Sequence, residues 1–485
     1  MKLYLHGHED RYAVEQLQLA LFPEEPMEPV DLPFTGDGAV SALHVGKTWL
    51  TATARITLHG KTAKATRRLA AKDADVPARR RLLQNTYYAA AVQLREPPKW
   101  GSLSGVRPTK LTTRHLLAGG DEKSADRLLE ERYHVAPERR RLCIEASKAT
   151  VEAAKRLREN DISLYIGIPF CPTRCAYCSF VSQSVEKSMK LIEPFMDALM
   201  LDIEATAAQL RRAGLRPVSL YMGGGTPTTL SAAQLDRLCG KLEREFDLSA
   251  LREYTVEAGR PDTITAEKLR TLRAHGVDRL SVNPQTMSDS VLEAIGRRHT
   301  AQDILEALEL VRACGGFAVN MDLIAGLPTD TPEGFSRTLD AVLELAPENV
   351  TVHTLSLKRG SGLALAGRGL PEAEEVRLML DESMARLRAA GYAPYYLYRQ
   401  KNMAGGFENT GWARPGFENL YNICIMEELC SIIAMGAGGS TKLVSDGGRR
   451  IKRMIAPKYP QEYISAAPGF AAGKERIGEF YGVQP

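Results

Sequence analysis

From residue 163 onward, short apolar runs alternate with longer segments in which apolar residues recur at helical spacing. A helix-compatible stretch follows each run, and the runs cover residues 163–167, 218–222, 253–257, 279–283, 318–324 and 350–355. Parallel strands require such crossovers, and the crossover helices cover the outer face of the sheet. The pattern therefore predicts an α/β fold in which six βα units form a parallel sheet curved into a full or partial barrel. Chemistry in such sheets lies at the carboxyl ends of the strands.

The segments that flank these units have different patterns. Residues 1–158 combine β-like runs at 42–50 and 51–58 with Arg-rich helical segments, which predicts a separate N-terminal accessory domain of the α+β type. After residue 368, a helix at 372–390, a strand at 392–398 and a Gly- and Asn-rich passage predict a mostly helical C-terminal domain that covers the site. The predicted domains are 1–158, 159–368 and 369–485.

Composition and charge do not indicate a partner. The chain has 485 residues, too many for one ordinary domain, with 44% hydrophobic and 25% charged residues and a net charge of +4. The basic runs at 79–81 and 139–141 stand among acidic residues and are interpreted as solvated helix faces, so no nucleic-acid partner is expected. The first residues lack a basic segment leading into an apolar core, and no stretch reaches the roughly 18 apolar residues of a membrane span. We therefore expect a cytoplasmic protein with no membrane partner.

Three of the eight cysteines cluster directly after the first predicted strand, as Cys171-x-x-x-Cys175-x-x-Cys178. Three thiolates on one loop can hold a four-iron cube and leave one iron open to a small molecule, whereas an electron-transfer cluster usually has a fourth Cys. Structural zinc sites favour paired Cys or Cys/His ligands, and no matching pair follows at short range. The other five cysteines, at 143, 239, 314, 424 and 430, are isolated and are interpreted as small buried hydrophobes.

The cysteine spacing, with the aromatic Tyr177 before the last Cys, resembles the signature of the radical S-adenosylmethionine (SAM) superfamily. The glycine-rich passage MGGGTPT at 222–228, after the second predicted strand, is similar to the superfamily's segment along the SAM amino group. Glycine suits a close approach of the backbone to a ligand. The resemblance implies a partial (β/α)6 TIM-like barrel with SAM as a cofactor. It also implies a [4Fe–4S] cluster on three metal ligands, Cys171, Cys175 and Cys178.

Further motifs resemble the oxygen-independent coproporphyrinogen III oxidase family, and within it the HemZ-type coproporphyrinogen dehydrogenases. They include the strand that leads into Ile168-Pro169-Phe170-Cys171 and the glycine-rich passage at 434–440. Glu257 and Asp322 can accept hydrogen bonds from the ribose or ammonium of SAM, and Arg297 can bind its carboxylate. The resemblance implies that these residues bind SAM: Tyr165, Tyr177, Gly224, Gly225, Thr226, Glu257, Gln285, Arg297, Asp322, Ser356 and Ser440.

Two positions depart from the best-known oxidases of this family. Gly167 stands where those enzymes have His before Ile-Pro-Phe, and Phe180 replaces their extra Cys two residues past the triad. Neither position is a cluster ligand. Both departures bear on how the substrate or a second SAM is held.

The resemblance implies oxidative decarboxylation of coproporphyrinogen III to protoporphyrinogen IX in anaerobic heme biosynthesis. The reduced cluster would cleave SAM to methionine and a 5′-deoxyadenosyl radical that attacks a propionate β-carbon of the substrate. The expected partners are the tetrapyrrole and a reducing electron donor such as flavodoxin or ferredoxin. An anionic tetrapyrrole needs cationic side chains. The candidates are Arg298, Lys358, Arg359, Arg399 and Lys401.

Three alternatives remain open. A heme-binding chaperone of the same family would carry a His-Asn-x-x-Tyr-Trp signature, and the nearest passage, at 419–422, reads Asn-Leu-Tyr-Asn. A heme-opening radical SAM methyltransferase would share the SAM residues and differ in its substrate pocket. A zinc-stabilised scaffold protein would be separated from both by metal analysis.

Overall fold

The computed structural model describes residues 1–22, 24–25, 27–178, 183–358, 360–367, 369, 371–400 and 403–483. The chain forms two compact units, Met1–Glu145 and the part from Ala146 onward, and short segments near residues 400 and 406 group with the first unit. Within the described ranges, no helix combines the length and the apolar character that a membrane span requires.

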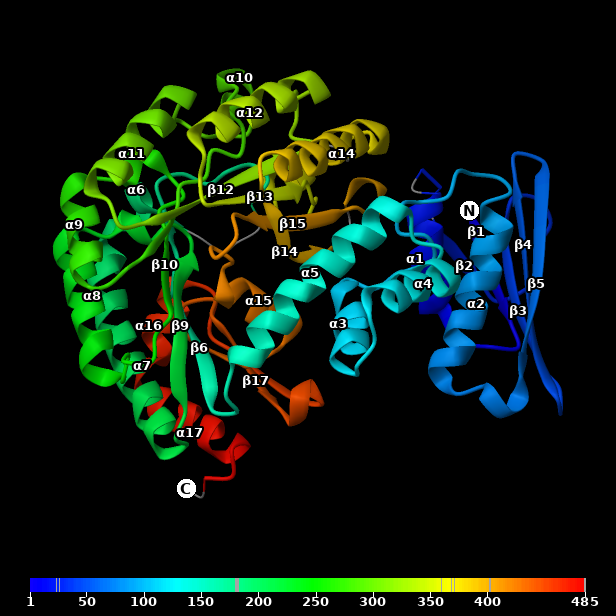
Figure 1. Cartoon of the computed structure of the whole chain (residues 1–485), viewed down its shortest axis with the longest axis horizontal. Coiled ribbons are helices and arrows are strands. Elements are labelled where there is room, and N and C mark those ends of the chain that lie inside the picture. Colours follow the sequence, from blue (N-terminus) through cyan, green and yellow to red (C-terminus); the bar gives the residue numbers. More distant parts are fainter. Residues whose placement is uncertain are drawn as a thin grey trace. The chain divides into compact units, whose positions relative to one another are not determined.

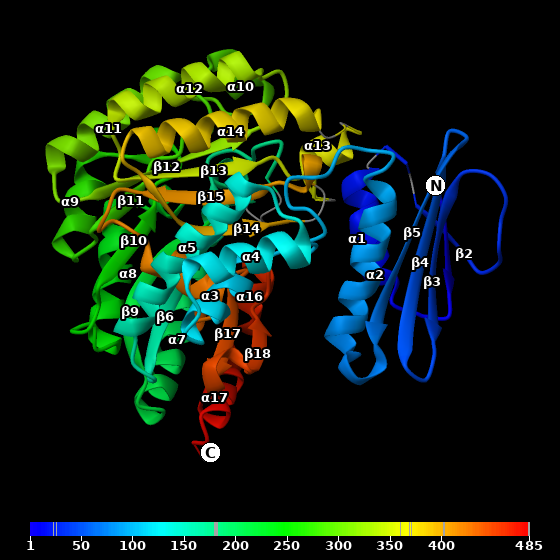
Figure 2. The ribbon, with the colours of Figure 1, turned by 45° about the vertical axis from the view of Figure 1, so that its right-hand side comes forward.

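The first unit is built on a sheet of strand order β2-β1-β3-β4-β5, and helices α1 and α2 cover one face of it (Figure 2). Leu50, Ala52, Ala54 and Ile56 alternate along β4 and pack into a core with residues of both helices. The bounds are β1 Lys2–His6, α1 Arg11–Leu21, β2 Glu28–Val30, β3 Gly38–Val45, β4 Trp49–Leu58, β5 Lys61–Ala70 and α2 Val76–Ala91. Helices α3 Thr109–Leu117, α4 Glu122–Tyr133 and α5 Pro137–Arg156 follow, and α5 runs across the boundary between the units.

The predicted strand at 42–50 is wrong, because a turn lies inside it. Strand β3 ends at Val45 and β4 begins at Trp49, where the Gly46 amide donates to the Trp49 carbonyl at 2.9 Å. Because apolar residues lie on both sides of the turn, the sequence pattern did not separate the end of β3 from the start of β4.

The six predicted βα strands are confirmed, and they lie in order as consecutive parallel neighbours of one sheet. They are β6 Asp161–Ile168, β9 Arg216–Gly224, β10 Glu253–Glu257, β11 Arg279–Ser281, β12 Ala318–Ala325 and β13 Asn349–Thr354. Figure 1 shows this sheet curved, with the crossover helices on its convex side. Strands β14 and β18 are its edges, so the barrel formed by the described residues is partial.

Local sequence explains the crossovers. Ser231, Thr300 and Thr331 each cap a helix by accepting a hydrogen bond from the backbone amide three residues later. Leu164, Ile166 and other apolar residues of the strands are fully buried. The crossover helices are α7 Ile192–Arg212, α8 Ala232–Glu245, α9 Ala266–Ala274, α10 Asp289–Ala294, α11 Ala301–Cys314, α12 Pro332–Leu345 and α14 Ala373–Ala389. Short elements near the strand ends are β7 Phe170–Cys171, β8 Gln183–Ser184, α6 Val185–Ser188 and α13 Gly362–Leu365.

The residues after 368 extend the same sheet at both edges instead of forming a separate compact unit. Strand β15 pairs antiparallel with β13, and β16 pairs parallel with β6. The predicted helix and strand correspond to α14 and β14. The remaining elements are β14 Ala393–Arg399, β15 Glu408–Ala413, α15 Leu420–Glu427, β16 Ser431–Gly436, β17 Ser440–Ser445, β18 Arg450–Ile455, α16 Pro460–Ala466 and α17 Phe470–Phe480. The accessory role of residues 1–158 and the covering role of residues 369–485 stay predictions.

Candidate functional site

The three clustered cysteines lie on the loop that follows β6, at the carboxyl end of the sheet. Cys171, Cys175 and Cys178 are all partly exposed. The loop is fixed by its backbone, since the Ala176 amide donates to the Ile295 carbonyl at 2.9 Å. Among the described residues, no three Cys, His, Asp or Glu side chains converge where one metal ion would sit. Three thiolates on one loop can each bind a different iron of a four-iron cube.

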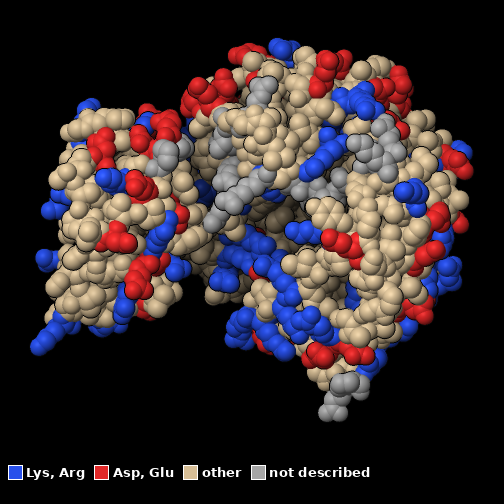
Figure 3. All heavy atoms as spheres, turned by 180° about the vertical axis from the view of Figure 1, so that it is seen from behind, with Lys and Arg blue, Asp and Glu red and all other residues tan. Residues whose placement is uncertain are grey.

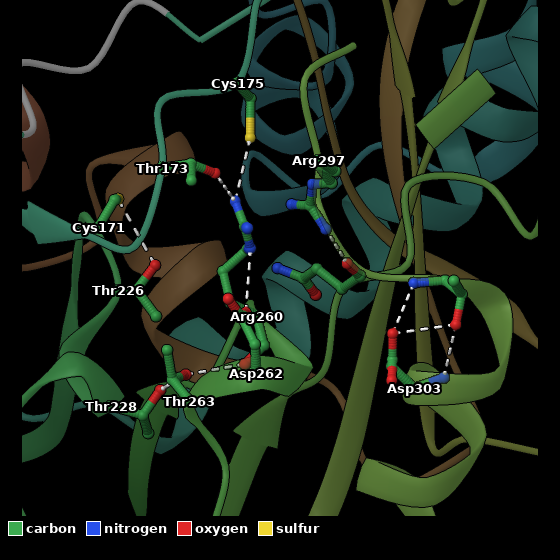
Figure 4. Close-up of polar contacts among 12 residues, drawn as sticks. Cys171, Thr173, Cys175, Thr226, Thr228, Arg260, Asp262, Thr263, Arg297 and Asp303 are labelled. Carbon is green, nitrogen blue, oxygen red and sulfur yellow. Dashed lines mark hydrogen bonds and ion pairs between the residues drawn. The ribbon is translucent and has the colours of Figure 1, made fainter. Parts of the chain in front are cut away.

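Two buried side chains donate hydrogen bonds to the cysteine sulfurs. The Thr226 hydroxyl donates to Cys171 Sγ at 3.5 Å, and Arg260 Nη1 donates to Cys175 Sγ at 3.8 Å (Figure 4). Arg260 Nη1 also donates to Thr173 Oγ1 at 3.0 Å, on the same loop. Such donors stabilise thiolates and tune the metal that thiolates hold. The residues present therefore fit an iron–sulfur cluster.

Arg297 is buried next to the loop and keeps one donor without a protein acceptor. Its Nη1 donates to the Asn283 carbonyl at 2.6 Å and its Nη2 to the Tyr177 hydroxyl at 3.3 Å. Its Nε has no hydrogen-bond partner. A buried guanidinium with a spare N–H fits a carboxylate, the group that SAM carries.

His299 lies in the same region and is 5% exposed, with no partner for either ring nitrogen. Burial lowers the pKa of His299 to about 3, helped by the positive charges of Arg297 and Arg260. The imidazole is therefore neutral at physiological pH.

Glu257 and Asp322, the two predicted carboxylates, have opposite protonation behaviour. Burial raises the pKa of Glu257 to about 7. Asp322 is also penalised by burial, but His353, Asn320 and Thr351 lower its pKa below the usual value. Carboxylates whose environments push their pKa values apart are typical of functional sites.

Three tyrosines stack beside Glu257. The Tyr221 ring lies 4.5 Å from that of Tyr421 and 6.3 Å from that of Tyr165, measured between centroids. Tyr421 belongs to α15, so a helix far along the chain contributes to the site.

The remaining predicted SAM residues differ in burial and contacts. Gln285 is 6% exposed and has φ +67°, and its amide donates to the Asp322 carbonyl at 2.9 Å. A non-glycine residue in this region of φ is strained, which is typical of binding sites. Ser356 is partly buried and forms a bridge with Met403. Ser440 is exposed at the start of β17.

The glycines of the two glycine-rich passages pack against backbone at the strand ends. A Cβ at Gly225 would lie 2.4 Å from the Phe170 carbonyl oxygen, and Gly224 has φ +104°. A Cβ at Gly436, which has φ +93°, would lie 2.2 Å from the Gly167 carbonyl oxygen. At Gly167, the position of the first departure, a Cβ would lie 2.8 Å from the Ala437 carbonyl oxygen, so glycine at both 167 and 436 allows β6 and the end of β16 to approach closely.

The described cationic candidates for the substrate have different surroundings. Arg298 and Lys358 are exposed. Arg399 groups with the first unit, where it donates to the carbonyls of Gly406 and Leu103. Phe180, Arg359 and Lys401 lie outside the described residues.

Comparison with known proteins agrees with this geometry. The profile of the Radical SAM superfamily matches residues 165–342. The oxygen-independent coproporphyrinogen-III oxidase-like protein HemZ of Bacillus subtilis is 40% identical over 376 residues, which are 75% of this chain and 74% of HemZ.

The chain belongs to the radical SAM superfamily, in the oxygen-independent coproporphyrinogen III oxidase family. Other members of this radical SAM family are also similar. The heme chaperone HemW of B. subtilis is 32% identical over 59% of this chain and 73% of its own length. The solved structure of coproporphyrinogen III oxidase (HemN) from Escherichia coli matches with a TM-score of 0.54 and 27% identity, over 66% of this chain and 72% of HemN.

The predicted family, fold class and cofactors are therefore confirmed. As a radical SAM protein, the chain uses a [4Fe–4S] cluster and SAM. Which residues contact each cofactor stays a prediction. Sequence reasoning missed Arg260, His299 and Tyr421, although Arg260 closely follows the predicted Glu257 and His299 closely follows the predicted Arg297.

Proposed function

We propose that this protein decarboxylates coproporphyrinogen III oxidatively to protoporphyrinogen IX in anaerobic heme biosynthesis. The observation that carries the proposal is the 40% identity to the oxidase-like protein HemZ, which extends over three-quarters of both chains. The proposal includes the cytoplasm as location and a flavodoxin or ferredoxin as electron donor.

Seven of the predicted residues have a definite task in this function. Cys171, Cys175 and Cys178 would hold three irons, and Arg297 would use its spare N–H for the SAM carboxylate. Glu257 and Asp322 would accept hydrogen bonds from SAM, and the strained backbone at Gln285 would position it beside Asp322. When bound, the cluster and SAM supply the one-electron chemistry that attacks an unactivated C–H bond. The protein's contribution is orientation and the exclusion of water.

Positively charged side chains gather at one edge of the sheet, away from the cysteine loop. Lys442 pairs with Ile432, which is level with Ser163 near the start of β6, and Arg450 pairs with Ser445 further along. Lys and Arg side chains gather in the region of β17 and β18 (Figure 3). Arg449, Arg450 and Arg453 are exposed there. This patch lies toward the amino end of β6, so the proposed tetrapyrrole is not assigned to it.

A heme chaperone is the second candidate, because HemW is 32% identical over 73% of its length. Within the passage at 419–422, Asn419 caps α15 and Tyr421 stacks on Tyr221. Both side chains are therefore engaged inside the protein, which favours the oxidase.

The two functions are separated by product analysis. The protein, purified anaerobically and reconstituted with iron and sulfide, is incubated with coproporphyrinogen III, SAM and a chemical reductant. We expect protoporphyrinogen IX and methionine, and neither from the Cys175→Ala variant. Stoichiometric heme binding with SAM present and no decarboxylated product would assign the chaperone function instead.

A further inference from the structure

Arg260 places a buried positive charge against the cysteine loop. Its side chain is 3% exposed, and its Nη1 contacts both Cys175 Sγ and Thr173 Oγ1. Its Nε lies 3.3 Å from an oxygen of Asp262, and its Nη2 has no partner (Figure 4). A guanidinium in this setting is unfavourable unless an anion faces it.

The backbone that carries Arg260 is held firmly. The Arg260 carbonyl accepts a hydrogen bond from the Thr263 hydroxyl at 2.8 Å. The same Thr263 hydroxyl lies 2.6 Å from that of Thr228, in the loop after β9. The loops after β9 and β10 therefore support each other, and Arg260 is directed at Cys175 by the fold.

A fixed cation at a cluster sulfur affects electron transfer. Reduction adds a negative charge to an iron–sulfur cluster, so N–H···S bonds and nearby positive charge stabilise the reduced state. Asp262 is 39% exposed at its side chain and offsets part of the charge of Arg260. His299 is neutral and does not add to it.

We propose that Arg260 raises the reduction potential of the cluster through its hydrogen bond to Cys175, and that Asp262 moderates this effect. Arg260 is thus a positioning and tuning residue for the transfer of the electron into the cluster. The inference rests on the proposed ligation of the cluster by Cys175.

The test is a redox titration of the reconstituted protein without SAM, followed by electron paramagnetic resonance of the reduced cluster. We expect Arg260→Gln to lower the midpoint potential, because both the charge and the N–H···S bond are lost. Asp262→Asn should raise it by a smaller amount, since the guanidinium is left uncompensated. Arg260→Lys keeps the charge and should fall between Gln and the natural residue.

The matched control is Arg237→Gln on α8. Arg237 pairs with Asp197 at 2.5 Å, away from the cysteine loop, so this variant should keep the natural potential. An unchanged potential in Arg260→Gln with full iron content, or shifts of the same sign in Arg260→Gln and Asp262→Asn, would overturn the proposal. If Arg260→Gln holds no iron, the Asp262→Asn variant decides the proposal: a higher midpoint potential supports it, and an unchanged or lower one overturns it.

The outcome is independent of the substrate. If the potentials shift as expected but no protoporphyrinogen IX forms, the proposed function is wrong and the proposal that Arg260 tunes the cluster still holds. Full iron in Cys175→Ala would remove the tuning proposal, because Cys175 would then not be a ligand.

Discussion

The Tyr221 hydroxyl donates a hydrogen bond to the Glu257 carboxylate at 2.6 Å. Tyr221 lies inside β9 and is not a proposed ligand of the cluster. Its ring stacks on that of Tyr421, so the Glu257 carboxylate that it binds is held in one direction. A carboxylate fixed in this way is prepared to accept hydrogen bonds from a ligand without reorganising.

Glu257→Gln should weaken SAM binding by about 1–3 kcal/mol, the usual loss when one partner of a buried hydrogen bond is removed. Isothermal titration calorimetry on the reconstituted protein measures the change, and iron content should be unaffected. Normal SAM affinity together with failure only toward the tetrapyrrole would reassign Glu257 to the substrate.

Glu257 should also make stability depend on pH. Its pKa is raised from the ordinary 4.5 to about 7, so between these values the folded protein binds more protons than the unfolded chain. Its contribution to stability is therefore present below pH 4.5 and is lost as pH rises through 7. At pH 8, Glu257→Gln should increase the free energy of unfolding by about 1–3 kcal/mol and so raise the melting temperature. At pH 5 the substitution should have little effect on either quantity. A gain that is equal at both pH values would show that the carboxylate titrates normally.

Alanine at Cys171, Cys175 or Cys178 should abolish the visible absorbance of the cluster and SAM cleavage. Ser variants of Cys143 and Cys239 are the matched controls. Both thiols are fully buried, and they bond to Thr112 and Tyr254 respectively. We expect these controls to retain iron. Stoichiometric zinc without iron after anaerobic preparation would contradict the cluster assignment.

Gly436→Ala should destabilise the protein by about 1–3 kcal/mol, because the added methyl would overlap the Gly167 carbonyl and occupy a left-handed backbone. Gly473→Ala in α17 is the control. A Cβ there meets nothing within 4 Å, so it should stabilise the helix by about 0.5–1 kcal/mol. Denaturant unfolding of both variants measures the difference, and equal effects would show that β6 and β16 can separate without cost.

Much of this site was predictable because its signals are local. The cysteine spacing on one loop, and the positions of Glu257, Gln285 and Asp322 near the ends of successive predicted strands, can be identified along the chain. Parallel strands place their carboxyl ends at one edge, so order along the chain became proximity in space.

Other features depend on contacts between distant parts of the chain, and the hydrophobic periodicity of the sequence does not predict such contacts. Strand β16 joins β6, and Ser163 meets Cys430 across 267 positions of sequence. The contact of Arg260 with Cys175 and the stacking of Tyr421 on Tyr221 arise in the same way. The sequence by itself determined the position of the cysteine loop, the order of the parallel strands and the family. Only the tertiary structure decided that Arg260 contacts Cys175, because that contact depends on how two loops 85 positions apart pack together.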